Sequence, residues 1–231
     1  MTKSNQFFRT VNFDWDRLRV EMDSDISLDY EFDIEPEQFL KFAELDIGGN
    51  NERAYVNALS NSKRAIDCQV DKILHCFKLN AKRQNFPAKI EILKELGIVA
   101  PRILRKVINK RNYLEHEYKS PEKEEVEDAI DVATLFIEAS DRTLHVFLNR
   151  FTLGDEENML DEAHRFKHCV YFIYREHDNE FELRGYNDDW KDVIRISSED
   201  VEYRPILRLV VAIARQRNVD EAIQGLRHAV S

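Results

Sequence analysis

The chain of 231 residues exceeds the usual single domain, so we expect two domains, or one domain with a substantial extension. Its 43% hydrophobic and 34% charged residues allow a buried core and argue against wholesale disorder. The longest apolar stretch, residues 209–214, is far too short for a membrane-spanning helix, which needs about 20 residues. The N-terminal segment also lacks the apolar core of a secretory signal. We therefore expect a cytoplasmic protein without a membrane partner.

The net charge of −10 is unevenly distributed along the chain. Residues 1–50 contain 5 Lys and Arg against 12 Asp and Glu, a net charge of −7. Residues 51–120 contain 15 against 7, a net charge of +8, and residues 121–231 contain 14 against 25, a net charge of −11. A basic segment between acidic flanks fits ordinary helical surfaces and equally fits a site for a polyanion.

Residues 1–35 are expected to form an acidic N-terminal arm. Apolar residues alternate with polar ones from Ile26 to Phe32, so this stretch fits a strand as well as a loosely held arm. From Pro36 the apolar spacing predicts a helix that ends at Gly48. A long amphipathic helix is expected to follow, with its inward positions spread over residues 55–77.

Three further helices are predicted by the next apolar patterns. One is short and ends at Gly97, and a second covers about residues 102–118. The third starts at the Ser120-Pro121 N-cap signal, and its pattern continues as far as Gly154. Long helices joined by short connections predict an antiparallel bundle over residues 36–150.

Residues 151–231 are expected to form a small α+β domain. Residues 170–174 and 181–183 predict a hairpin, residues 193–196 a third strand, and two apolar stretches near the C-terminus two helices. The expected fold class is therefore mainly α, an antiparallel helical bundle with a small C-terminal α+β appendage.

The most informative motif lies at the end of the helix expected over residues 102–118. Arg111, Asn112, His116 and Tyr118 follow the pattern Arg, four residues beginning with a polar one, His, any residue, Tyr. These residues, placed in a helical region, resemble the motif of the HEPN superfamily, the higher eukaryotes and prokaryotes nucleotide-binding domain. The resemblance implies a HEPN-like bundle over residues 36–150.

This resemblance also implies a function. Many family members are metal-independent endoribonucleases, often toxins of toxin-antitoxin or antiviral systems, that act as homodimers with two motifs facing one cleft. Arg111, Asn112, His116 and Tyr118 would then be the catalytic residues. RNA supplies its own 2'-OH nucleophile, so the protein needs a base, an acid and a cation for the phosphorane charge. His116 can exchange protons near neutral pH, and Arg111 can hold phosphate oxygens.

Residues near the motif extend the expected site. Arg105 and Asn109 lie on the same polar stripe of this helix as His116, and together with Lys110 they are the expected RNA-binding residues. In relatives with the tyrosine, a partner nucleotidyltransferase can adenylylate it, which makes such an antitoxin a candidate partner through Tyr118. The expected partners are thus RNA, a second copy of the chain and this enzyme.

Two further expectations concern alternatives and cofactors. The alternative function is a non-catalytic HEPN-like module that binds nucleic acid or a nucleotide and mediates dimerisation. No cofactor is expected, and no metal site, because Cys68, Cys76 and Cys169 form no pair at ligand spacing.

Overall fold

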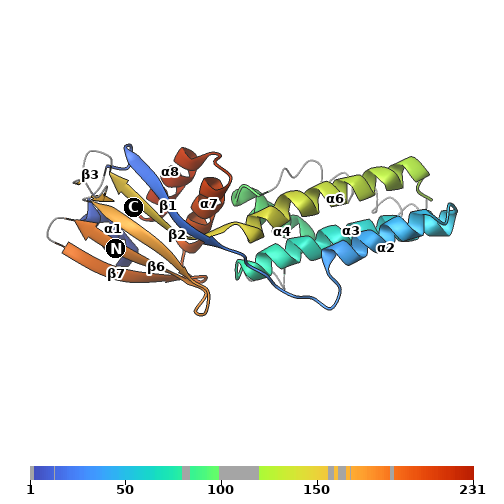
Figure 1. The fold of residues 1–231 in the computed structure, drawn as a ribbon, viewed down its shortest axis with the longest axis horizontal. Coiled ribbons are helices and arrows are strands. Elements are labelled where there is room, and N and C mark those ends of the chain that lie inside the picture. Colours follow the sequence, from blue (N-terminus) through green and yellow to red (C-terminus); the bar gives the residue numbers. More distant parts are fainter. Residues whose placement is uncertain are drawn as a thin grey trace. The chain divides into compact units, whose positions relative to one another are not determined.

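The computed structural model describes residues 3–12, 14–79, 84–98, 120–155, 159–160, 165–166, 168–187 and 190–231. The chain divides into two compact units (Figure 1). Leu28–His145 form the first, called here the helical unit, whereas Met1–Ser27 and Val146–Ser231 together form the second, the sheet unit. The chain therefore passes between the units twice, after residue 27 and after residue 145.

The described part of the helical unit contains α2 (Pro36–Ile47), α3 (Glu52–Cys76), α4 (Phe86–Glu95) and α6 (Lys123–His145). Local capping explains where two of them begin, because the Asn51 side chain accepts a hydrogen bond from the N–H of Ala54 and the Asn85 side chain accepts one from Ala88. Gly97 follows α4 with a φ of +77°, a conformation that favours glycine. The three helices predicted to lie before residue 98 are confirmed.

Helix α3 is the centre of the helical unit, because it packs against α2, α4 and α6. Its inward face is fully buried at Leu59, Ile66 and Val70, and that of α6 at Val126 and Ala133. Each burial removes apolar surface from water, which is the main force that holds the helices together.

The sheet unit contains five strands in the order β1-β2-β5-β6-β7, every neighbouring pair antiparallel. They are β1 (Leu18–Ile26), β2 (Phe147–Asp155), β5 (Cys169–Arg175), β6 (Glu180–Asn187) and β7 (Trp190–Ser197). A separate two-stranded hairpin consists of β3 (Met159–Leu160) and β4 (Arg165–Phe166), and the helices are α1 (Lys3–Val11), α7 (Tyr203–Ala214) and α8 (Val219–Ala229). The predicted hairpin, third strand and C-terminal helices are confirmed.

One face of this sheet forms the core of the sheet unit. Phe151, Phe172, Leu183 and Ile194 are register partners on four adjacent strands, and all are buried. Helices α1 and α7 pack against this sheet, and α8 packs against α7 (Figure 1). The opposite face consists of the alternate positions, since successive side chains of a strand point to opposite sides.

The expected fold class, a mainly α HEPN-like bundle with a small appendage, is wrong. The five-stranded sheet with its helices is a unit comparable in size to the helical one. The main error lies at residues 147–154, predicted to continue a helix, which form β2 instead. Apolar residues there suit either structure, and β2 is held by pairing with β1 and β5, as in the stacking of Phe151 on Phe172 at 4.6 Å.

The acidic stretch at the N-terminus contains β1, an edge strand of this sheet. The strand considered for the alternation from Ile26 to Phe32 does not form, because β1 covers Leu18–Ile26 and ends where that alternation begins. Its central residues are exposed and mostly charged. Charged residues on an edge strand discourage pairing with another chain.

Candidate functional site

The residues of the motif lie outside the described residues. This applies to all seven expected site residues, which are Arg105, Asn109, Lys110, Arg111, Asn112, His116 and Tyr118. In the chain they fall between α4 and α6, which both belong to the helical unit. Among the described residues, two other polar arrangements are candidate sites, one in each unit.

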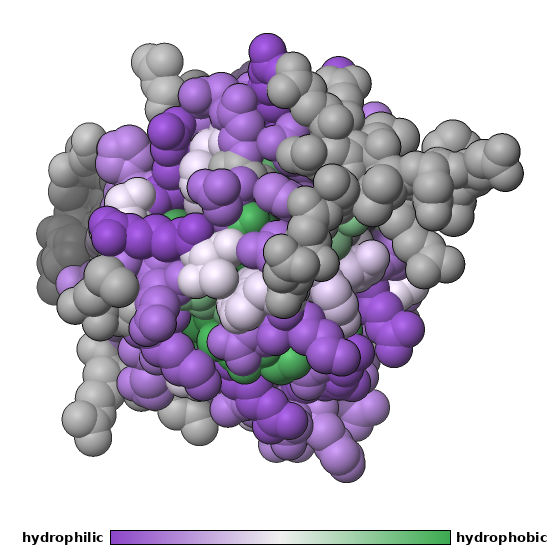
Figure 2. All heavy atoms as spheres, turned by 90° about the vertical axis from the view of Figure 1, so that its left-hand side faces the viewer, coloured by the Kyte–Doolittle hydropathy of each residue, from purple (hydrophilic) through white to green (hydrophobic). Residues whose placement is uncertain are grey.

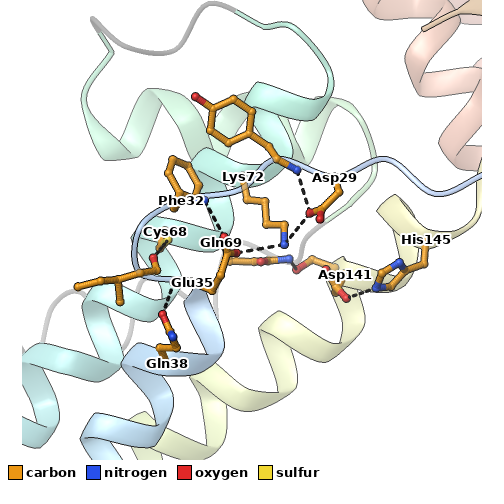
Figure 3. A network of polar contacts seen from close by, with 12 residues as sticks. Asp29, Phe32, Glu35, Gln38, Cys68, Gln69, Lys72, Asp141 and His145 are labelled. Carbon is orange, nitrogen blue, oxygen red and sulfur yellow. Dashed lines mark hydrogen bonds and ion pairs between the residues drawn. The ribbon is translucent and has the colours of Figure 1, made fainter.

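The polar arrangement in the helical unit is centred on Lys72 of α3 (Figure 3). Its ammonium nitrogen lies 2.9 Å from a carboxylate oxygen of Asp29 and 3.2 Å from one of Glu35, and its side chain is only 13% exposed. The hydrogen bond from Lys72 lowers the pKa of Asp29. Burial alone would lower the pKa of Lys72, but the two carboxylates outweigh it and raise that pKa. Both carboxylates thus serve to hold the lysine.

Aromatic and backbone contacts fasten the same segment of chain. The Tyr30 ring stacks on the imidazole of His75, with centroids 4.3 Å apart and planes 12° apart. The N–H of Leu28 donates a hydrogen bond of 2.9 Å to the carbonyl of Leu144. Residues 28–35 are therefore attached to both α3 and α6, and we call them the strap.

Beneath the strap, α3 and α6 share a buried polar contact. The Gln69 side chain donates a hydrogen bond of 3.1 Å to the hydroxyl of Ser140, and both residues are buried. Within α6, Asp141 pairs with His145, whose side chain is 63% exposed (Figure 3). The contact between Gln69 and Ser140 helps to set the register of the two helices, and neither contact leaves a nucleophile poised for reaction.

The arrangement in the sheet unit is centred on Glu182 of β6, which is 5% exposed. The guanidinium of Arg175 donates two hydrogen bonds to its carboxylate, at 3.1 and 2.9 Å, and Arg184 donates a third at 2.7 Å. The hydrogen bonds from Arg175 and Arg184 lower the pKa of Glu182, so the carboxylate is charged at neutral pH. One buried anion thus holds two arginines of adjacent strands in place.

A shallow cavity of about 470 Å³ opens beside this cluster. It is lined mainly by polar and charged groups, including Arg175, Glu182 and Arg195 with His177 and Asp178 of the turn between β5 and β6. Acidic and basic groups nearly balance there, and Arg195 lies within 4.0 Å of carboxylate oxygens of Asp178, Glu180 and Glu182. Sequence reasoning overlooked the cluster, although alternating charges in the predicted hairpin were a signal for it.

The cysteines are poor nucleophile candidates. Burial raises the pKa of each of Cys68, Cys76 and Cys169 to about 11, so the thiols are protonated at neutral pH. Among the described residues, no three or more His, Cys, Asp or Glu side chains are grouped so as to hold a metal ion. Likewise, none of the helices described is both long and apolar enough to cross a membrane.

Comparisons with protein-family models, with curated proteins and with solved structures found no match for this chain. Function is therefore inferred from the motif and from the physical chemistry of the surfaces described above.

Proposed function

We propose that the protein is a metal-independent endoribonuclease of the HEPN type, with its active site in a cleft between two copies of the chain. The observation that carries this proposal is the motif of Arg111, Asn112, His116 and Tyr118. Two further facts support it. The motif falls within the unit whose described secondary structure is helical, and it lies in the basic segment of an otherwise acidic chain.

The proposed reaction needs one base and one acid. His116 of one copy removes the proton from the ribose 2'-OH, and the 2'-oxygen forms a bond to phosphorus. The bond from phosphorus to the 5'-oxygen breaks, and the protonated His116 of the second copy donates a proton to that oxygen. The products are a 2',3'-cyclic phosphate and a 5'-hydroxyl. Since each motif has one histidine, the dimer is what supplies both proton-transfer groups.

The remaining motif residues have supporting roles in this proposal. Arg111 neutralises the charge that develops on the phosphorane, and Asn112 orients the phosphate or the imidazole. Arg105, Asn109 and Lys110 bind RNA next to the cleft. Tyr118 is the group that a nucleotidyltransferase antitoxin would adenylylate, which would silence the toxin.

The decisive experiment compares RNA cleavage by the wild type with cleavage by His116→Ala on denaturing gels. The substitution should lower the cleavage rate by about 10²- to 10⁴-fold while leaving RNA affinity nearly unchanged. Arg111→Ala should weaken both binding and turnover, because a phosphate contact acts in the ground and transition states alike.

Two controls separate this mechanism from its alternatives. Wild-type cleavage should survive excess EDTA and should leave a cyclic phosphate end. Cleavage that needs a divalent metal or tolerates His116→Ala would contradict the mechanism. RNA binding without any cleavage would favour the non-catalytic module that binds nucleic acid and mediates dimerisation.

A further inference from the structure

The face of the five-stranded sheet opposite its buried core, called here the open face, has a charge opposite in sign to that of the sheet unit. Register partners and the two-residue alternation place five basic side chains on this face of β2, β5, β6 and β7, against two acidic ones. The basic residues are Arg150, Arg175, Arg184, Lys191 and Arg195, and the acidic ones are Glu180 and Glu182. The sheet unit as a whole has 16 Lys and Arg against 22 Asp and Glu. A face of net charge +3 thus belongs to a unit of net charge −6.

The neighbouring edge strand reduces this positive charge only in part. Arg19 and Glu21 of β1 are the register partners of Gly154 and Thr152 on the same face, and their charges offset each other, whereas Asp23 adds a negative charge that acts on Tyr171. Of the two acidic residues on this face of the four strands, Glu182 is buried under the guanidinium groups that it holds. Basic residues therefore outnumber acidic ones on the exposed part of the face. The side chain of Arg195 is 59% exposed and lies within 4.0 Å of carboxylate oxygens of Asp178, Glu180 and Glu182.

Aromatic rings lie among these cations. Tyr171 of β5 and Tyr186 of β6 are half-buried and meet edge to face, with ring centroids 5.3 Å apart. Tyr171 is the register partner of Arg184, and Tyr186 is the partner of Lys191. Gly154 of β2 lies in the same row across the sheet as Tyr186 and Lys191. The ring of Phe166 covers Gly154 and occupies the place that a side chain there would take.

Glu182 makes this surface more rigid. Its carboxylate holds Arg175 and Arg184 in fixed positions, so a ligand that binds them loses less side-chain entropy than it would with free arginines. Figure 2 shows the sheet unit from the left-hand side of Figure 1, where the coloured surface is largely hydrophilic with small hydrophobic areas.

We propose that the open sheet face binds single-stranded RNA, with Arg150, Lys191 and Arg195 contacting phosphates and Tyr186 stacking on a base. Charge complementarity selects a polyanion, and ring faces beside cations favour nucleic acid over an acidic peptide, which has no bases to stack. The choice of RNA rests on the proposed function, in which this face holds the substrate of the nuclease. The binding itself requires no catalysis.

The test measures the affinity of fluorescein-labelled single-stranded RNA of about 20 nucleotides by fluorescence anisotropy. All proteins carry His116→Ala, so that the probe is not cleaved. Replacing Arg150, Lys191 and Arg195 by Gln should weaken binding at least tenfold at about 0.1 M salt. Because each phosphate contact contributes about 0.7 to the slope of log affinity against log salt, the slope should fall by about 2.

A matched control removes the same charge elsewhere on the sheet unit. Arg9, Arg204 and Arg217 are exposed residues of α1, α7 and the turn after α7, and their combined replacement by Gln should change affinity less than twofold. Equal effects of the test and control variants would overturn the proposal, as would a wild-type affinity too weak to measure.

The aromatic contribution separates RNA from an acidic peptide. Tyr186→Leu should weaken RNA binding about fivefold without changing the salt slope, because stacking involves no counterion release. Polyglutamate should compete poorly with RNA for this face. Indifference to Tyr186→Leu together with equal competition by polyglutamate would mean that the face binds acidic peptides, which contradicts the RNA proposal.

The same measurements distinguish this inference from the proposed function. If the sheet variant loses RNA affinity while the wild type cleaves nothing, the sheet face binds RNA and the nuclease proposal fails. If the wild type cleaves RNA but the sheet variant retains full affinity, the nuclease proposal survives and the sheet-face inference fails.

Discussion

The ammonium nitrogen of Lys72 lies 2.9 Å from a carboxylate oxygen of Asp29, which precedes it by 43 positions in the chain. This contact, with the hydrogen bond from Lys72 to Glu35, fastens the strap to the longest helix of the helical unit. The strap begins where the chain enters this unit, directly after Ser27 of the sheet unit. Lys72 thus anchors the segment by which the N-terminal part of the chain enters the helical unit.

Lys72→Met should destabilise the protein, because it leaves two carboxylates close together without their cation. We expect the free energy of unfolding at pH 7 to fall by about 1–2 kcal/mol, measured by urea denaturation. Lys94→Met is the matched control, since Lys94 and Glu91 form a pair that is about half exposed, and it should change stability by less than about 0.5 kcal/mol.

The same variant should alter the acid dependence of stability. The pKa of Asp29 is lowered in the folded protein, so its stabilising contribution is present above the unfolded pKa of about 3.9 and is lost as the pH falls through the folded value. Without Lys72 this contribution disappears, and stability should fall less steeply below about pH 4. Identical acid profiles of wild type and Lys72→Met would contradict the assignment.

Glu182→Ala tests the cluster on the sheet. Removal of the buried carboxylate leaves the guanidinium groups of Arg175 and Arg184 next to each other without their shared partner. We expect a loss of about 2 kcal/mol in urea unfolding at pH 7, and little from Glu180→Ala, which removes a more exposed carboxylate of the same strand. Similar losses from both substitutions would show that the cluster is no more than surface charge.

Glu182 should also contribute to the acid dependence of stability. Its pKa is lowered in the folded state, so its contribution is present above the unfolded pKa of about 4.3 and is lost as the pH falls through the lower folded value. The difference in stability between wild type and Glu182→Ala should therefore shrink as the pH is lowered from 5 to 2. If the stability difference between wild type and Glu182→Ala stayed constant over that pH range, this role of Glu182 would be contradicted.

Gly185→Ala tests the packing of α1 on the sheet. A methyl group at this position would lie 2.8 Å from a ring carbon of Phe7 and 2.9 Å from a methyl carbon of Val11, closer than such atoms can approach. We expect a loss of about 1–3 kcal/mol in thermal unfolding. Gly225→Ala in α8 is the control, because its closest neighbour lies 3.7 Å away and alanine favours a helix, so its stability should be unchanged or slightly higher.

The proposed composite active site requires a homodimer. Light scattering at micromolar concentration should give a mass of twice 27.4 kDa. Because both His116 residues take part in each cleavage under the proposed mechanism, dilution below the dissociation constant of the dimer should reduce the specific activity. Full activity of a monomer would exclude the shared cleft.

Patterns within short stretches of sequence determined much of the secondary structure. The apolar pattern of the sequence alone predicts the helices that begin at Pro36 and after Asn51 and the hairpin of β5 and β6. Each depends on interactions between residues close in the chain, and these leave a periodic signal in the sequence. The motif from Arg111 to Tyr118 was likewise found from the sequence alone, and as a site it remains a prediction.

Only the tertiary structure decided which residues form the sheet and which side chains meet on it. Residues 147–155 are a strand because β1 and β5 lie on either side of them, and Leu18, a partner of Asp155, is 137 positions away in the chain. The cluster at Glu182 similarly requires Arg175 of a neighbouring strand. Contacts between distant segments leave no period in a single sequence, because their formation depends on the folded arrangement of the whole unit and not on local propensity.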